Sequence, residues 1–448
     1  MTSHDANRAS QAAQEQHAAI GVGSQEQNRA VYRRATHPDA QWFGNAGLGL
    51  FIHWGISSVH GNIDLSWGMM ADTPWDAEQQ GRNKVTPEQY FQLAERFHPD
   101  QYDPDQWLRD AKEAGFRYAV MTTKHHDGFT LWPSAQGDWG VQTYLPGRDL
   151  VQEYVAACRK NGLKVGLYYS PPDWHYNRHY MSFHYGSQDQ KRFPGRPHYG
   201  LRHEPIAEIP EKPEGFEEGY RAYLRAHVQE LLTRYGRIDV LFFDGGPAVI
   251  SMEEIRAMQP GIVVNPRMHG YGDYLTPECR MPQQPLEGWW ELCEIWPQGP
   301  WGYVATEIYK PTGWMLSRFA QVRSWGGNYL INVGPRPTGE MPDVYYERLA
   351  ELRAWMAHSG ESVLDTAPGP FPGQSNVPVT TRNNTWYLHL LPDWHSPVTV
   401  QRVTRPDSAH LLRTGDMLPF QFQGDTLTID VPEQCRTSLD DVVAITWG

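Results

Sequence analysis

The sequence predicts a (β/α)8-like barrel of the TIM type, followed by a C-terminal β-sandwich. Three observations indicate this fold class. Short apolar runs alternate with helical patterns after residue 47, polar residues stand at the carboxyl ends of those runs, and short alternating strands follow a Pro- and Gly-rich linker at 367–378. We therefore expect an amino-terminal arm over 1–35, the barrel over 36–366 and the sandwich over 367–448.

The length and charge of the chain limit what the protein does. Its 448 residues are enough for one large barrel and an accessory module. Lys and Arg total 39, whereas Asp and Glu total 52, so the formal net charge is −13. This charge disfavours nucleic acid and anionic membranes as partners. The four cysteines lack the close spacing of a zinc site or a disulfide framework.

The first 35 residues are rich in Gln, Ala, Asn and Ser. They lack the basic start and apolar run of a signal peptide, and no window of the chain approaches 18 uncharged apolar residues. We therefore expect a cytoplasmic protein without a transmembrane segment, whose amino-terminal arm is helical or frayed.

Six apolar segments are predicted to form buried parallel strands. Each is rich in β-branched or aromatic residues and is bounded by turn residues. The segments are 47–54, 118–124, 164–170, 239–244, 261–267 and 328–334. Their apolar residues run continuously rather than in alternation, which suits parallel strands that are covered on both faces.

Helical patterns lie between these strands and after the last of them. They cover 105–114, 149–161, 214–235 and 345–358. The second ends in Asn-Gly, a common helix stop, and the third carries an apolar stripe at intervals of three and four residues. Repeated strand–helix units fit a barrel or an open doubly wound sheet. The barrel is favoured because no GxGxxG or GxxxxGK[ST] motif follows any strand.

Polar side chains stand where predicted strands end, and barrels build their active sites there. The set consists of His53, Lys124, Ser170, Asp244 and Arg267. Asp244 is the strongest candidate, because it ends the apolar run LFFD and precedes two glycines that let a ligand approach the backbone closely. A structural carboxylate that caps a loop or pairs with an arginine is the alternative.

His125 and His126 follow the predicted strand at 118–124. Adjacent residues of an extended segment point to opposite sides, so the pair cannot simply chelate one metal, and no HExxH-like spacing is present. We therefore expect these histidines to form hydrogen bonds to a polar ligand rather than to hold a metal. The alternatives are ordinary loop histidines for this pair and a satisfied core histidine for His53.

A cluster of acids between residues 278 and 307 is interleaved with tryptophans. The acids are Glu278, Glu287, Glu291, Glu294 and Glu307, and the tryptophans are Trp289, Trp290, Trp296 and Trp301. A carboxyl group beside large apolar rings has a raised pKa and stays protonated near neutral pH. One ionised Asp and one protonated Glu form the asymmetric pair that glycoside hydrolysis requires. The pattern alone does not choose among the glutamates.

Several segments, in this order along the chain, resemble the α-L-fucosidase family of glycoside hydrolases, family 29. They are FIHWG (51–55), TTKHHDGFTLWPS (122–134), GLYYS (166–170), FFDG (242–245), VVNPR (263–267), WELC (290–293), WGY (301–303) and GGNYLINVGPRPTGEMP (326–342). The likeness covers roughly residues 40 to 365. The resemblance implies a barrel followed by a β-sandwich, and a retaining double displacement without metal or organic cofactor.

The resemblance also implies roles for individual residues. Asp244 matches the nucleophile, and Glu291 best matches the acid/base, with Glu287 and Glu294 as reserves. The residues expected to bind the sugar are His53, His125, His126, Tyr169 and Arg267 for its hydroxyls, and Trp67 and Trp301 for its ring and C5 methyl. The implied partner is a fucosylated oligosaccharide or glycoside, and a homo-oligomer stays open.

One position departs from the family pattern. Ser66 stands where the resemblance leads us to expect a glutamate before Trp67, and a neutral hydrogen bond has roughly half the strength of a charged one. Taken together, the resemblance implies an exo-acting retaining α-L-fucosidase, in which the two catalytic carboxyl groups lie roughly 5 to 5.5 Å apart. Two alternatives remain: a retaining glycosidase for a related sugar such as α-L-galactose, and a non-catalytic carbohydrate-binding barrel protein.

Overall fold

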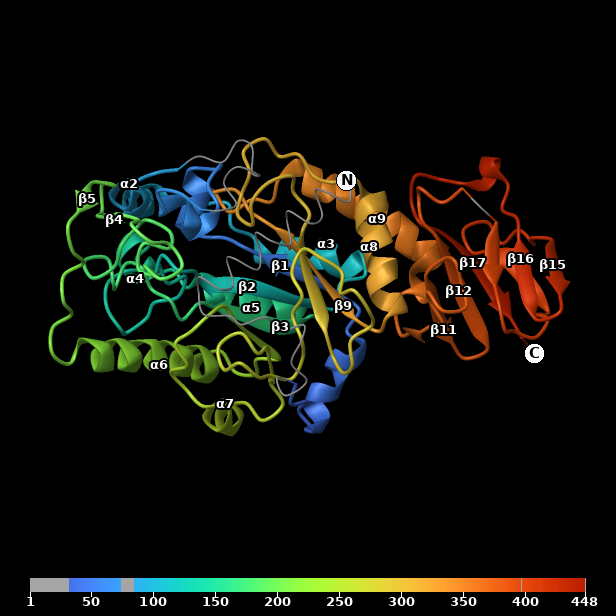
Figure 1. The fold of residues 1–448 in the computed structure, drawn as a ribbon, viewed down its shortest axis with the longest axis horizontal. Coiled ribbons are helices and arrows are strands. Elements are labelled where there is room, and N and C mark those ends of the chain that lie inside the picture. Colours follow the sequence, from blue (N-terminus) through green and yellow to red (C-terminus); the bar gives the residue numbers. More distant parts are fainter. Residues whose placement is uncertain (1–31, 74–83, 396, 448) are drawn as a thin grey trace.

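A computed structural model of the chain describes residues 32–73, 84–395 and 397–447. Figure 1 shows a parallel sheet surrounded by helices and, at one end of the long axis, the antiparallel strands of the C-terminal region. The predicted fold class, a barrel followed by a β-sandwich, is confirmed. Most of the predicted amino-terminal arm, residues 1–31, lies outside the described residues.

The barrel wall contains a sheet of seven parallel strands in the order β7-β6-β3-β2-β1-β9-β8. The strands are β1 (Leu48–Ile52), β2 (Tyr118–Lys124), β3 (Lys164–Tyr169), β6 (Val240–Phe243), β7 (Val263–Val264), β8 (Glu291–Ile295) and β9 (Asn328–Val333). Each of the six predicted segments contains a strand, although β7 covers only two of the seven residues predicted at 261–267. The strand β8 was not predicted from the sequence.

The irregular segment 273–279 connects the two edges of this sheet. The amide of Asp273 donates to the carbonyl of Val264 in β7 at 2.8 Å. On the other side, the amide of Leu275 donates to Trp289 O, and the amide of Glu291 in β8 donates to Leu275 O, both at 2.9 Å. The segment therefore takes the place of an eighth strand and closes the barrel.

Helices cover the outside of the barrel. They are α2 (Pro87–Phe91), α3 (Pro104–Glu113), α4 (Val141–Tyr144), α5 (Leu150–Lys160), α6 (Phe216–Arg234), α7 (Met252–Met258), α8 (Thr312–Ser324) and α9 (Asp343–Ser359). The four predicted helices correspond to α3, α5, α6 and α9. None of the helices in the described part of the chain is long and apolar enough to cross a membrane.

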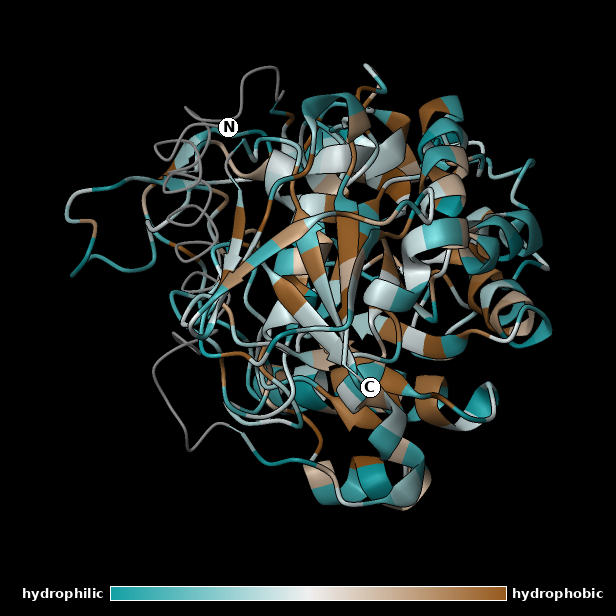
Figure 2. Cartoon of the chain, turned by 90° about the vertical axis from the view of Figure 1, so that its right-hand side faces the viewer, coloured by the Kyte–Doolittle hydropathy of each residue, from teal (hydrophilic) through white to brown (hydrophobic). Residues whose placement is uncertain are grey.

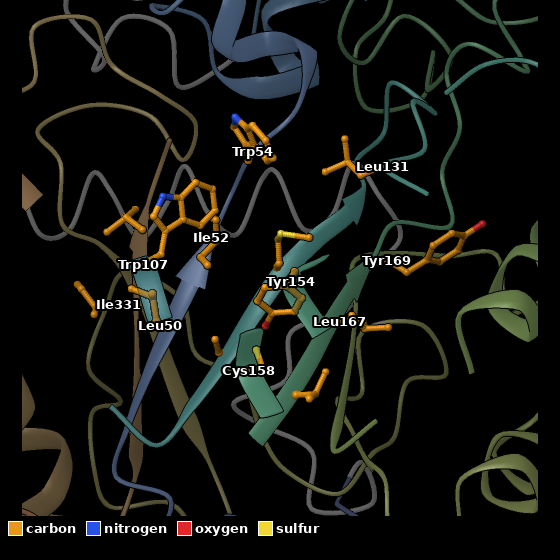
Figure 3. Close-up of a cluster of buried hydrophobic side chains, with 14 of the residues drawn as sticks. Leu50, Ile52, Trp54, Trp107, Leu131, Tyr154, Cys158, Leu167, Tyr169 and Ile331 are labelled. Atoms are coloured by element: carbon orange, nitrogen blue, oxygen red, sulfur yellow. The ribbon is translucent and has the colours of Figure 1, made fainter. Parts of the chain in front are cut away.

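Apolar side chains pack on both sides of the barrel wall. Figure 2 views the molecule from the end that carries the C-terminal strands, and the strands in the centre of this view are rich in apolar residues. The outer cluster, seen in Figure 3, joins Leu50 and Leu167 of the strands to Trp107 of α3 and Tyr154 of α5. Alternate strand residues such as Phe51 belong to a separate cluster inside the barrel. Burial on both faces explains why the strands read as continuous apolar runs.

A 3₁₀ helix at Pro38–Asn45 covers the amino-terminal end of the barrel. Its Phe43 ring lies 4.4 Å from the ring centroid of Tyr274 and 6.2 Å from that of Tyr118, the first residue of β2. Because this end is filled by aromatic rings, a ligand reaches the barrel from the opposite end, where the strands have their carboxyl termini.

The C-terminal region consists of two antiparallel sheets that share an apolar core. One has the strands β10 (Ala367–Pro368), β11 (Val379–Arg382), β12 (Thr385–Leu390), β17 (Asp441–Thr446) and β14 (Ser408–Leu411), and the other has β13 (Val398–Val400), β16 (Thr426–Ile429) and β15 (Phe420–Gln423). The predicted strands at 385–390, 398–403 and 426–431 correspond to β12, β13 and β16. The last two end before their predicted bounds.

Candidate active site

A pocket opens at the carboxyl ends of the barrel strands. It is lined by Phe51, His53, Leu65, His125, Tyr168, Phe242, Asp244, Arg267, Glu278, Cys293 and Trp301. It contains about 330 Å³ of space that no atom fills, open solvent at its mouth included. The mixture of aromatic and polar side chains around this space is typical of a site for a small molecule.

Asp244 follows β6 and is held in the pocket by two donors. The hydroxyl of Tyr168 donates to Oδ2 at 2.7 Å, and Nη1 of Arg267 donates to Oδ1 at 2.9 Å. Burial, followed by the adjacent carboxylate, raises the pKa of Tyr168 well above its usual range, so the phenol remains a donor. The next residue, Gly245, has φ 93°, a conformation that favours glycine and turns the chain away from the carboxylate.

Arg267 also binds a second carboxylate of the pocket, that of Glu278. Its Nη2 donates to Glu278 Oε2 at 2.8 Å, while Nη1 donates to Asp244. The two terminal nitrogens of a guanidinium lie side by side, so the two carboxylates must be close together. Glu278 lies on the segment that closes the barrel, beside β8. The arrangement provides the pair of adjacent carboxyl groups that a retaining glycosidase uses.

Two histidines of the pocket are oriented through their Nδ1 atoms. Nδ1 of His53 lies 2.7 Å from Oδ1 of Asn332, and Nδ1 of His125 lies 2.6 Å from Oγ of Ser66. Burial lowers the pKa of His53 to about 4 and that of His125 well below its usual range. Both rings are therefore neutral near pH 7, and His53, which donates through Nδ1, has Nε2 available as an acceptor for a sugar hydroxyl.

His126 is the third histidine near Asp244. Its Nδ1 hydrogen-bonds to Ser170 Oγ. Its Nε2 has no hydrogen-bond partner among the described residues and lies 4.0 Å from Asp244 Oδ2. A buried nitrogen without a partner, next to an open pocket, indicates a ligand that completes its hydrogen bonding.

The positions of His125, His126 and Asp244 correct one step of the sequence reasoning. The chain leaves the extended conformation at the end of β2, so the two histidines do not point to opposite sides as strand residues would. One ligand atom from each of the three residues lies within 4.8 Å of the others, so together they could hold a metal ion. Ligands of a tetrahedral zinc site are roughly 3.4 Å apart, so the three side chains would have to close around the ion.

Ser66, the position that departs from the family pattern, is fully buried and does not line the pocket. Its hydroxyl accepts a hydrogen bond from the amide of Asp127 at 2.8 Å and contacts His125. The preceding residue, Leu65, presents its side chain to the pocket and has φ 48°. At this segment Leu65 therefore gives the pocket an apolar surface, and Ser66 orients His125.

Comparison with known proteins agrees with this geometry. The family model described as Alpha-L-fucosidase matches residues 13–361. The chain belongs to the α-L-fucosidase family. Mouse (Mus musculus) tissue α-L-fucosidase is 28% identical over 386 residues, which cover 80% of this chain and 78% of that protein. The chain is thus similar to glycoside hydrolases over most of its length.

Two solved structures resemble this member of the α-L-fucosidase family. α-L-Fucosidase isoenzyme 1 from Paenibacillus thiaminolyticus has a TM-score of 0.73 and 30% identity, covering 92% of this chain and 99% of its own. A family 29 α-L-fucosidase from Bacteroides thetaiotaomicron has a TM-score of 0.72 and 22% identity, covering 95% and 97% of the two chains. The second likeness supports the fold, and the first supports both fold and family.

The structure does not bring Glu291, the acid/base expected from the resemblance, to the pocket. Glu291 is the first residue of β8, pairs in register with Asn328 at the start of β9, and accepts a hydrogen bond at 2.5 Å from Tyr118 at the start of β2. The strand pairing places Glu291 level with residue 47, whereas His53 follows the last residue of β1, so the two lie about six strand residues, or roughly 20 Å, apart along the strands. Glu291 is fully buried beneath the pocket.

Tyr169 is a second predicted site residue that points elsewhere. Its hydroxyl lies 3.2 Å from Nδ1 of His227 on the outer side of the barrel wall. Because neighbouring strand residues face opposite sides, Tyr168 occupies the pocket in its place. The reserve residue Glu294 also faces outward, where its carboxylate accepts hydrogen bonds from Arg318 and from a tyrosine of β9.

The remaining predicted residues gather around Asp244. His53, His125, Arg267 and Trp301 line the pocket, and the ring centroid of Trp301 lies 5.1 Å from that of His53. Trp67 does not line the pocket, but its ring lies edge-on to that of His126, with the centroids 5.6 Å apart. Tyr168 and Leu65, which also line the pocket, and the contact of Glu278 with Arg267 were not predicted from the sequence.

Proposed function

We propose that the protein is an exo-acting, retaining α-L-fucosidase that releases terminal α-L-fucose from oligosaccharides, with Asp244 as nucleophile and Glu278 as acid/base. The observation that carries this proposal is the single guanidinium of Arg267, which binds both carboxyl groups in one pocket. Family membership supports the sugar, and the geometry supports the roles of the residues.

In the first step, an oxygen of Asp244 attacks the anomeric carbon while Glu278, in its protonated form, gives its proton to the glycosidic oxygen. The bond between that carbon and the leaving oxygen breaks, and an ester with Asp244 forms. Tyr168 and Arg267 keep the attacking carboxylate in a fixed orientation, so little reorganisation is needed before attack.

In the second step, the ionised Glu278 takes a proton from a water molecule, whose oxygen attacks the same carbon. The ester bond to Asp244 breaks, fucose leaves with its original configuration, and both carboxyl groups return to their starting states. Asp244 and Glu278 act from opposite faces of the anomeric carbon, and because no water molecule has to fit between Asp244 and the sugar, the two carboxyl groups of a retaining enzyme lie only about 5 to 5.5 Å apart. Their shared arginine supports this requirement.

The side walls of the pocket suit the polar and apolar parts of fucose. The neutral rings of His53 and His125 and the unpartnered Nε2 of His126 beside Asp244 can bind hydroxyl groups. Phe51, Leu65 and Trp301 offer apolar surface to the ring and the C5 methyl. The apolar Leu65 favours a methyl group over the hydroxymethyl group of L-galactose. Rates on aryl α-L-fucoside and aryl α-L-galactoside compare the two sugars directly.

The variant Asp244→Gly tests the proposal. We expect kcat on an aryl α-L-fucoside to fall by at least 10³-fold, and azide to restore turnover with formation of a glycosyl azide of inverted configuration. Asp416→Ala, at an exposed turn of the sandwich, is the matched control and should retain the parent rate. NMR of the first-formed sugar should show the α anomer. Activity of Asp244→Gly within a few-fold of the parent, or a β anomer from the parent enzyme, would contradict the proposal.

A further inference from the structure

Asn332 in β9 lies beside the pocket, on the inner side of the barrel wall. It pairs in the strand register with Phe51 of β1, which lines the pocket. Because strand residues alternate, its side chain points to the same side as Leu330 of the inner cluster. The side chain is fully buried and does not line the pocket, so its amide must form its hydrogen bonds within the protein.

The amide of Asn332 joins two parts of the pocket wall. Its Nδ2 donates to the carbonyl oxygen of Trp301 at 2.7 Å, and its Oδ1 lies 2.7 Å from Nδ1 of His53. A backbone carbonyl only accepts, so Nδ2 must be the atom that faces Trp301. Oδ1 therefore faces His53 and, as an acceptor, requires a proton on Nδ1. Because burial keeps the His53 ring neutral near pH 7, Nε2 carries no proton and remains an acceptor.

The same end of β9 also holds the backbone on both sides of this contact. The amide of His53 donates to the carbonyl oxygen of Val333 at 3.1 Å. A Cβ on Gly334 would lie 2.5 Å from the carbonyl carbon of Gly302, so the residue after Trp301 packs directly on the chain that follows β9. The end of β9 thus fixes His53 relative to Trp301, whose ring centroids lie 5.1 Å apart.

We propose that Asn332 is a positioning residue for sugar specificity, which couples the recognition of one sugar hydroxyl by Nε2 of His53 to the recognition of the C5 methyl by the ring of Trp301. The inference rests on the proposed function and adds a specificity determinant to it. Without the amide of Asn332, the ring of His53 can turn or take the tautomer with its proton on Nε2, and the carbonyl group of Trp301 loses its donor. Both kinds of discrimination therefore weaken together.

Asn328, at the other end of β9, provides a matched control. Its Oδ1 accepts a hydrogen bond from the amide of Gly47 at 2.8 Å, and its Nδ2 donates to the carbonyl oxygen of Phe43 at 2.6 Å. Asn328 is also buried, but it lies at the amino-terminal end of the barrel, away from the pocket. Replacing either asparagine by leucine removes two buried hydrogen bonds of similar geometry, so a purely structural effect should be alike in the two variants.

The variants Asn332→Leu and Asn328→Leu test this inference on an aryl α-L-fucoside, its monodeoxy analogues and the analogue that lacks the C5 methyl. In the parent, loss of the hydroxyl that His53 binds and loss of the methyl should each lower kcat/KM by about tenfold or more. In Asn332→Leu, we expect the ratio of kcat/KM between the fucoside and each of these two analogues to shrink by about fivefold or more. In Asn328→Leu, both ratios should stay within about twofold of the parent.

A measurement on the parent enzyme avoids any effect of the variants on folding. Nitrogen NMR of the parent, labelled at histidine, shows which ring nitrogen of His53 carries the proton, and the signals of this residue are identified by their loss in His53→Gln. We expect the proton on Nδ1. A proton on Nε2, unchanged ratios in Asn332→Leu, a change in only one of the two ratios, or equal changes in Asn328→Leu would overturn the inference alone. A parent enzyme inactive on every fucoside would overturn the proposed function, and the inference with it.

Discussion

Replacement of Glu291 by glutamine should make the protein more stable at alkaline pH while leaving catalysis intact. Glu291 is fully buried at the amino-terminal end of the barrel. Burial raises the pKa of its carboxyl group to about 8, although the hydrogen bond from Tyr118 and the charge of Arg267 act in the opposite direction. Its Oε1 has no hydrogen-bond partner among the residues of the described ranges.

The expected size follows from the two pKa values. In the unfolded chain the carboxyl group has a pKa of 4.5, whereas in the folded protein it is about 8. Between these values the folded state keeps a proton that the unfolded chain releases, so the contribution to stability is complete below pH 4.5 and is lost as the pH rises through 8. At 1.36 kcal/mol for each pH unit, the loss amounts to about 2 kcal/mol at pH 6 and roughly 4 to 5 kcal/mol at pH 8.

Urea unfolding at pH 5, 6 and 8 measures this difference between the parent and Glu291→Gln. The variant cannot ionise, so its free energy of unfolding should exceed that of the parent by an amount that grows with pH. Glu433→Gln, at an exposed position of the sandwich, should follow the parent curve. Parallel pH curves for the parent and Glu291→Gln would refute the reasoning. A loss of kcat on fucosyllactose to the level expected for an acid/base variant would return Glu291 to the mechanism.

Three further outcomes follow from the site. Glu278→Ala should lose about 10³-fold in kcat/KM on fucosyllactose, and far less on an aryl fucoside with a good leaving group. Azide should rescue the activity of this variant. Equal losses on the two substrates would count against the role of Glu278 as the acid. Tyr168→Phe should lower kcat/KM by about 10- to 100-fold, because it removes one of the donors to Asp244. The urea midpoint should not change comparably. An unchanged rate would show that this hydrogen bond does not contribute to catalysis. Zn²⁺ should inhibit by binding His125, His126 and Asp244, and EDTA should reverse the inhibition; inactivation by EDTA alone would contradict a reaction without metal.

The sequence was sufficient for the strands of the barrel but not for its closure. Continuous apolar runs identified β1, β2, β3, β6, β7 and β9, because burial on both faces is a local property of composition. The strand β8 mixes acids with apolar residues, and the segment 273–279 has no regular pattern. Its conformation depends on hydrogen bonds to strands on both sides of it, which only the folded chain provides.

The lack of local information also explains why Tyr169, rather than Tyr168, was expected in the site. Tyr168 and Tyr169 are both buried, so composition does not distinguish the inner from the outer side of β3. The strand rule states only that they face opposite sides. The hydrogen bond from Tyr168 to Asp244 decides between them, and it joins residues 76 positions apart in the sequence.

The choice of acid/base shows why a raised pKa by itself does not identify a catalytic acid. Tryptophan-rich surroundings led to the expectation of a protonated glutamate, and Glu291 has that property. The burial that keeps its proton in place also separates it from any substrate. Glu278 lines the pocket, and Arg267 links its carboxylate to that of Asp244, the proposed nucleophile. In the proposed reaction Asp244 loses its charge when it forms the ester, and the arginine then keeps Glu278 as its remaining carboxylate partner.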